Sequence, residues 1–189
     1  MTVANSSWRI VEETLPIIIL FSLIELFTGG FLSSIVSEAV NAPGLLIIVP
    51  GILGLRGNIS SALGARISSG LHLGYISANK FSDALKVNIL IGIALSLIMS
   101  FLLSIFAWMM CSWTSPVCMS LINFVLISVL TGLLSGVILS FTTASIAILS
   151  SRRGLDPDNT TLPSSASIGD VMTIICLLIA VNLVVGLGL

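Results

Sequence analysis

Long apolar segments alternate with short polar connections along the whole chain. Five of these segments are long enough for an α-helix that crosses a bilayer, which needs about 20 mostly apolar residues. The pattern therefore predicts an all-α membrane protein with spans at about 15–35, 43–65, 85–110, 119–150 and 163–188. The fourth segment is longer than a bilayer requires, so it is expected to tilt or to project into water.

The composition leaves little room for another class of protein. Of the 189 residues, 56% are hydrophobic and 8% are charged, and the mean hydropathy is +1.19. A soluble domain carries about 25% charged residues, so most of this surface must face the lipid bilayer. The 7 Lys and Arg residues form no cluster, which excludes a nucleic-acid binder. We expect residues 1–189 to form one transmembrane domain without a soluble regulatory domain.

The basic residues indicate how the chain is oriented. Short cytoplasmic loops are enriched in Lys and Arg. All basic residues except Arg56 fall on one side of the predicted spans: Arg9, Arg66, Lys80, Lys86, Arg152 and Arg153. The sequence therefore predicts a multi-pass protein of the cell membrane with a cytoplasmic amino terminus.

The second predicted span contains residues that disfavour a helix at its middle, beginning with Pro50. We therefore expect this span to be interrupted, and transporters use interrupted helices of this kind to direct carbonyl oxygens at cations. Gly54, Arg56 and Gly57 would then line an ion path. Asn58 would offer a neutral oxygen ligand suited to a hard cation. The alternative is a glycine-rich face that packs tightly against another helix.

Acidic residues inside two spans need a partner or a water-filled path, because a charge in hydrocarbon is costly. Asp170 lies in the last span, which we expect to begin at Pro163. We predict that Asp170 binds a cation and that small residues before it line the path: Ala166 and Ser167. The alternative is that Asp170 only joins two helices. Glu25, in the first span, either lines the path as a further ligand or pairs with Arg56.

The connection before the last span would lie at the cytoplasmic mouth of this path. Asp156, Asp158 and Asn159 there either collect cations or form a turn that caps the last helix. Capping is the favoured single explanation, and Asp158 could serve both purposes.

Other metal-ligating residue types are expected to be structural. His72 has no second His or Cys at ligand spacing, so we expect no zinc site. Cys111 and Cys118 lie near a turn on the opposite side of the membrane. We expect them to be free, small hydrophobic residues rather than a disulfide.

Two separated motifs resemble those of the MgtE magnesium transporters. The first is VPGILGLRGN at 49–58, followed by ARISS at 65–69 and LG at 73–74; the second is LDPDN at 155–159, followed by Pro163 and IGD at 168–170. The chain looks closest to the eukaryotic solute-carrier magnesium transporters, where a Pro, a Gly-Leu-Lys-Gly-Asn core and an Arg-Leu-Ser-Thr run follow in this order. The resemblance covers all five spans in outline.

The resemblance implies a five-helix domain that works as a homodimer, with the ion path on the two-fold axis and spans two and five lining it. It implies that Asp170 is the central Mg2+ ligand and that Asn58 matches the family's asparagine. Eukaryotic members carry two copies of the domain, so a single copy is expected to pair with an identical chain or a second half-size paralogue. The magnesium-sensing region of bacterial members is not expected, because only residues 1–14 precede the first span. Arg56 departs from the small residue of bacterial members and matches the basic residue of the eukaryotic branch.

These observations predict a divalent-cation transporter rather than an enzyme, with Mg2+ as the transported ion and no cofactor. Two Asp170 carboxylates facing each other across an axis would repel each other unless a cation lay between them. Mg2+ suits a site made of one or two carboxylates and waters. The alternatives are a structural or assembly subunit that transports nothing, and an exchanger coupled to Na+ or H+ instead of a channel.

Overall fold

The computed structural model describes residues 3–38, 43–78 and 82–186. Within these ranges the elements are α1 (Val3–Glu38), α2 (Leu45–His72), α3 (Asp83–Thr114), α4 (Leu121–Arg152) and α5 (Pro157–Gly186). Each of these 5 helices contains a stretch long and apolar enough to cross a membrane. The structure thus confirms an all-α, multi-pass membrane protein, with helices that extend beyond most of the predicted span boundaries.

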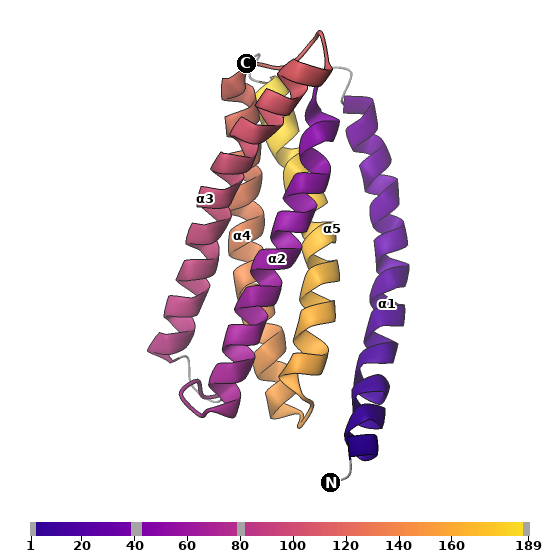
Figure 1. Ribbon diagram of the computed structural model, residues 1–189, viewed down its shortest axis with the longest axis vertical. Coiled ribbons are helices and arrows are strands. Elements are labelled where there is room, and N and C mark those ends of the chain that lie inside the picture. The colour runs from indigo at the N-terminus through magenta and orange to yellow at the C-terminus, as the bar shows by residue number, and fades with distance from the viewer. Residues whose placement is uncertain (1–2, 39–42, 79–81, 187–189) are drawn as a thin grey trace.

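Helices α2 to α5 form a bundle, and α1 lies along one side of it (Figure 1). α4 packs against both α3 and α5, and α2 packs against all three of the other bundle helices. α1 contacts almost only α5. α1 begins at the end of the bundle where α2 and α4 end, and α5 ends at the opposite end.

α3 and α4 pack through small and hydroxylated residues. The buried face of α3 recurs every three or four residues and includes Asn88, Gly92, Ser96, Ser100, Ser104 and Ala107. Glycines, serines and threonines of α4 are buried opposite: Thr131, Gly132, Ser135, Gly136 and Ser140. Small residues let two helix backbones approach closely in a membrane. Some of the hydroxyls donate to carbonyls of their own helix, as Thr131 does to Ile127 (2.7 Å) and Ser104 to Phe101 (2.6 Å).

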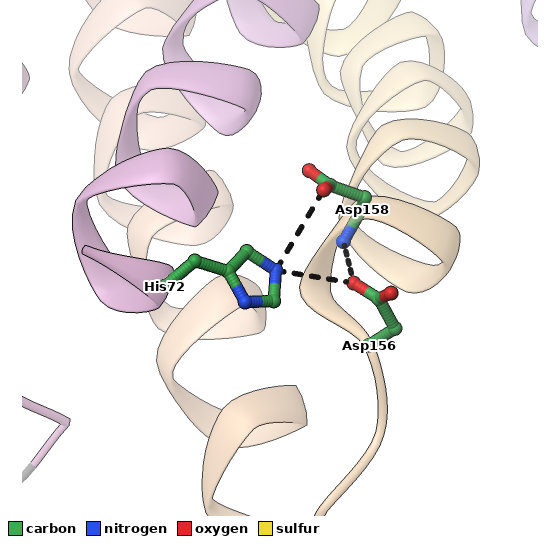
Figure 2. A group of neighbouring side chains, drawn as sticks. All are labelled: His72, Asp156 and Asp158. Atoms are coloured by element: carbon green, nitrogen blue, oxygen red, sulfur yellow. Dashed lines mark hydrogen bonds and ion pairs between the residues drawn. The ribbon is translucent and has the colours of Figure 1, made fainter. Parts of the chain in front are cut away.

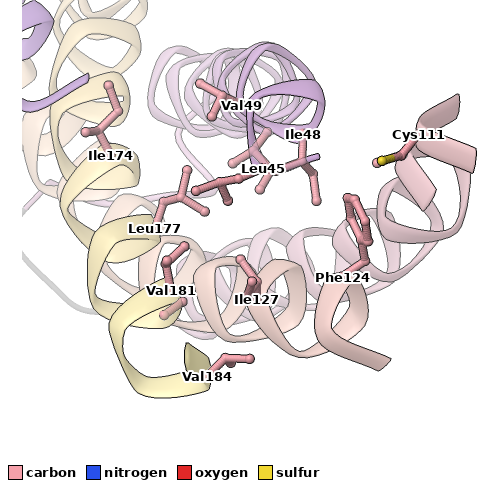
Figure 3. Packing of buried hydrophobic residues seen from close by; sticks show 13 residues of the cluster. Leu45, Ile48, Val49, Cys111, Phe124, Ile127, Ile174, Leu177, Val181 and Val184 are labelled. Carbon is pink, nitrogen blue, oxygen red and sulfur yellow. The ribbon is translucent and has the colours of Figure 1, made fainter. Parts of the chain in front are cut away.

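Two clusters of buried apolar residues lie toward the two ends of the bundle. The first includes Leu45, Ile48, Ile52, Phe124 and Val181 (Figure 3). The second includes Leu63, Ile67, Leu85, Ile89 and Ala147. Arg56 lies between the two clusters along α2 and is buried. The charged side chain of Arg56 is therefore buried near the middle of the bundle, whereas buried Ser and Thr side chains occur at other levels as well.

The predicted interruption of the second span is wrong, because α2 is one continuous α-helix of 28 residues. Pro50 lies near its beginning, so the missing amide leaves only the Leu46 carbonyl without its usual helical donor. A glycine in a helix costs about 1 kcal/mol. Leaving backbone groups unpaired in lipid costs several times more per group, so the glycines stay helical.

The last helix begins at Pro157, earlier than the predicted first residue Pro163. The Asp156 side chain caps it by accepting a hydrogen bond from the Asp158 backbone N–H (3.0 Å). Pro163 lies inside α5 and cannot donate to the Asn159 carbonyl one turn earlier. The Thr14 hydroxyl of α1 donates to that carbonyl instead (3.4 Å). Pro163 thus leaves an acceptor on α5 that helps to dock α1.

Cys111 and Cys118 form a disulfide, so the prediction of free thiols is wrong. The bond closes the turn between α3 and α4, with the two Cα atoms 6.0 Å apart. Next to it, the Met119 N–H donates to the Pro43 carbonyl (3.1 Å) and ties this turn to the start of α2. The sequence spacing alone did not show whether the two side chains would converge, because that depends on where α3 ends.

Candidate functional site

Asn58 and Asp170 each lie about halfway along a helix. Each follows the first residue of its helix by 13 positions, which is a distance of about 20 Å at 1.5 Å per residue. α2 and α5 pack against each other and run in opposite directions. Both polar side chains are therefore near the middle of the bundle's length, and Asp170 is deeper than a helix beginning at residue 163 would place it.

One face of α2 is open to the outside of the protomer. Its exposed residues recur every three or four positions, begin with the apolar Leu46 and are otherwise mostly small or polar: Pro50, Gly54, Asn58, Ala62, Arg66 and Ser69. A Cβ added at Gly54 or Gly57 would meet no atom within 4 Å. By contrast, the exposed face of α3 carries large apolar side chains such as Leu90 and Phe106. The open face of α2 is better suited to water or a partner helix than to lipid.

Asn58 is exposed on this open face, and its amide makes no hydrogen bond to the part of the chain that the structure describes. An amide that is not engaged within the protomer remains free to bind a ligand or a partner chain. This position fits the prediction that Asn58 offers an oxygen to a cation.

Arg56 lies on the opposite side of α2. Its side chain is 1% exposed and donates to the hydroxyls of Ser96 and Ser100 on α3, at 2.7 Å for Ser100. Positions two residues apart on a helix are separated by about 200°, so Arg56 and Asn58 point in nearly opposite directions. Side chains on opposite sides of a helix cannot line the same path. Arg56 and Asn58 therefore cannot both line the predicted ion path.

Asp170 is half-buried on α5, and its electrostatic neighbour is Glu25 of α1. Among the described residues no ion pair joins Glu25 to Arg56, so that alternative for Glu25 is wrong. Ala166 is half-buried and Ser167 is buried on the same helix. The negative charges of Asp170 and Glu25 repel each other, and a cation bound near them would relieve this repulsion.

A cluster that the sequence did not predict lies at the end of the bundle where α2 ends and α5 begins (Figure 2). His72 is the last residue of α2, and its Nε2 lies 3.4 Å from Asp156 Oδ1 and 3.7 Å from Asp158 Oδ2. One ligand atom from each of the three residues lies within 4.8 Å of the others. His72 and Asp156 are far apart in sequence, so a search for ligands at short spacing did not find this group.

Local structure places each member of this cluster. Gly74 has a φ of 78°, and its N–H donates to the Leu71 carbonyl (3.2 Å), so it ends α2 directly after His72. Glu13 of α1 accepts hydrogen bonds from the Asp156 N–H (3.3 Å) and from Asn159 Nδ2 (3.0 Å). Asp156 and Asp158 thus face His72, whereas the Asn159 amide is bound to α1. A cavity of about 260 Å³ lined by His72 and Asp156 opens beside them.

Residues 49–180 match the MgtE family, which is described as a family of divalent cation transporters, and the chain belongs to this family. Solute carrier family 41 member 2 of Mus musculus is 26% identical over 91% of this chain and 32% of its own length. The Xenopus laevis protein of that name is 29% identical, over 71% of this chain and 24% of its own length. The human protein is 28% identical, over 69% of this chain and 23% of its own length. The matched part of the chain therefore covers only 23–32% of the length of these relatives. The predicted resemblance to MgtE is confirmed.

Proposed function

We propose that this chain is a membrane domain that transports divalent cations, with Mg2+ as its substrate. The observation that carries the proposal is the open face of α2, on which Asn58 makes no hydrogen bond to the described residues and lies about halfway along its helix, as Asp170 does along α5. Membership of a family of divalent cation transporters supports it. The protein is on this view a transporter and not an enzyme.

The proposed transport unit is a homodimer. Two open faces of α2 would meet at a two-fold axis and remove small and polar residues from contact with lipid. Gly54, Gly57 and Asn58 would then line the path together with Ala166, Ser167 and Asp170 of α5. A dication between two Asp170 carboxylates would relieve their repulsion, and Mg2+ accepts one or two carboxylates plus waters. Glu25 would add negative charge beside Asp170, whereas Arg56 would hold α2 to α3.

The proposed orientation places the amino terminus in the cytoplasm of a cell whose plasma membrane contains the protein. Described basic residues gather at the end of the bundle where α1 begins: Arg66, Lys86, Arg152 and Arg153. Positive residues favour the cytoplasmic side. The mouth formed by Asp156, Asp158 and Asn159 would therefore open to the cytoplasm.

Mg2+ flux into proteoliposomes tests the proposal. We expect the wild-type chain to carry Mg2+ and Asp170→Asn to abolish flux while the protein remains folded, because the amide removes the charge that balances the dication. Asn58→Leu should also block flux. Leu90→Ala, on the lipid-facing side of α3, is the matched control and should retain flux. If proteoliposomes that contain the wild-type chain take up no Mg2+, the structural-subunit alternative is supported. Full flux in Asp170→Asn would remove Asp170 from the mechanism.

Flux measured with and without a Na+ or H+ gradient separates an exchanger from a channel.

Cross-linking tests the proposed axis. Gly54→Cys should form a covalent dimer on oxidation, because the two copies of residue 54 would face each other. Leu90→Cys, on the outer face of α3, should not. A disulfide that forms in a preparation of this chain alone also favours a homodimer over pairing with a paralogue. Cross-linking of Leu90→Cys and not of Gly54→Cys would refute this arrangement.

A further inference from the structure

We infer that His72, Asp156 and Asp158 form a second divalent-cation site at the mouth of the bundle, which takes transition metals in preference to Mg2+. This mouth site does not depend on the proposed transport function. It joins the last residue of α2 to the beginning of α5, the two helices that carry Asn58 and Asp170 (Figure 2).

The distances between the ligand atoms support a metal ion better than a direct ion pair. A charge-assisted hydrogen bond between an imidazolium and a carboxylate measures about 2.7–2.9 Å. His72 Nε2 instead lies 3.4 Å from Asp156 and 3.7 Å from Asp158. Ligands held at about 2.1 Å around a tetrahedral metal lie about 3.4 Å from one another. The two distances from His72 are thus close to those between ligands that share one ion, and the two carboxylate oxygens lie within 4.8 Å of each other.

The surroundings leave room for an ion and its waters. The side chains of His72 and Asp158 are each 53% exposed, and that of Asp156 is 38% exposed, so an ion can enter without unfolding. The cavity of about 260 Å³ beside them supplies space for the water ligands that complete the coordination. The Asp156 oxygen that faces His72 accepts a hydrogen bond from the Asp158 N–H, which holds this carboxylate in position.

The ligand types decide which ions the site should prefer. One imidazole nitrogen with two carboxylate oxygens suits Mn2+, Co2+ and Zn2+, whereas Mg2+ prefers oxygen ligands alone. Affinity for such mixed sites rises from Mn2+ to Co2+. A bound ion would also join the ends of α2 and α5 and raise the melting temperature, because it binds only the folded state.

The test is a Co2+ titration of the metal-stripped full chain in detergent, followed by visible absorption, in the Asp170→Asn background so that the proposed transport site does not contribute. We expect one Co2+ per chain, with a band intensity typical of a nitrogen-containing site. His72→Ala should weaken Co2+ binding at least tenfold, and Asp158→Asn should do the same. Asp83→Asn is the matched control, since Asp83 is an exposed acid at the same end that pairs only with Lys86 among the described residues (2.7 Å), and it should bind Co2+ as before.

His72→Asp provides a further check on ligand identity. Three carboxylates should keep Mn2+ binding but reduce the preference for Co2+ over Mg2+, because the imidazole nitrogen is lost. Equal Co2+ affinity in His72→Ala and its parent would overturn the mouth site, as would loss of all Co2+ binding in Asp170→Asn alone. If the wild type carries no Mg2+ but Co2+ still binds through His72, the transport proposal fails and the mouth site stands.

Discussion

The packing of α3 against α4 gives the sharpest prediction about the fold. Gly136 of α4 approaches α3 so closely that a Cβ there would lie 2.6 Å from the Ser96 Cβ. Carbon atoms in contact prefer about 3.5–4.0 Å, so Gly136→Ala forces the two helices apart by about 1 Å. Overpacking of this kind costs about 1–3 kcal/mol. Arg56 also lies beside this position, at 3.4 Å from the same Cβ, so little relaxation is available.

Gly30→Ala is the matched control, because Gly30 is exposed on α1, outside the proposed path, and a Cβ there would meet nothing within 4 Å. Both substitutions change the helix propensity of one residue by the same amount, about 1 kcal/mol in favour of alanine in water. The difference between their unfolding free energies therefore isolates the steric contact, and we expect Gly136→Ala to be less stable than Gly30→Ala by about 2 kcal/mol. Equilibrium unfolding in detergent measures this difference. Equal stability of the two variants would refute the close α3–α4 contact.

Two further predictions concern the ends of the bundle. Cys111→Ser removes a disulfide that closes a short loop with a sequence separation of 7. The loss should lower the free energy of unfolding by about 2.5 kcal/mol. Reduction of the wild-type disulfide should lower the melting temperature in the same way. Equal melting of oxidised and reduced protein would contradict this. Glu13→Ala removes the acceptor of two hydrogen bonds from α5 and should weaken the docking of α1 by about 1 kcal/mol. Faster hydrogen exchange in α1, with α3 unchanged, is the expected readout, and unchanged exchange in α1 would count against the contact.

The helices themselves could be predicted because they follow from local composition. Apolar segments of sufficient length must become helices in lipid, where each backbone group needs a partner inside its own segment. The same rule explains why the predicted break in the second span was wrong. Pro50 and the glycines weaken a helix by amounts that count in water, but unpaired backbone in lipid costs more, so α2 stays continuous.

The candidate site could be predicted only in part. The sequence identified Asp170 and Asn58 as polar residues within apolar spans, and the MgtE motifs agreed with that choice. It could not separate Arg56 from Asn58, since both lie in one short motif and their directions depend on which face of α2 packs against α3. The ligand spacing in the sequence also predicted no metal site at His72, because the two carboxylates that face it come from a distant segment.

The sequence by itself determined that this chain is a five-helix membrane protein of the MgtE type, because hydropathy and motif order are properties of neighbouring residues. Only the tertiary structure decided which side chains meet. It buried Arg56 against the serines of α3, left Asn58 on an open face, and brought His72 to Asp156 and Asp158. These side-chain positions depend on how whole helices pack, because contacts between distant segments set the rotation and the end points of each helix.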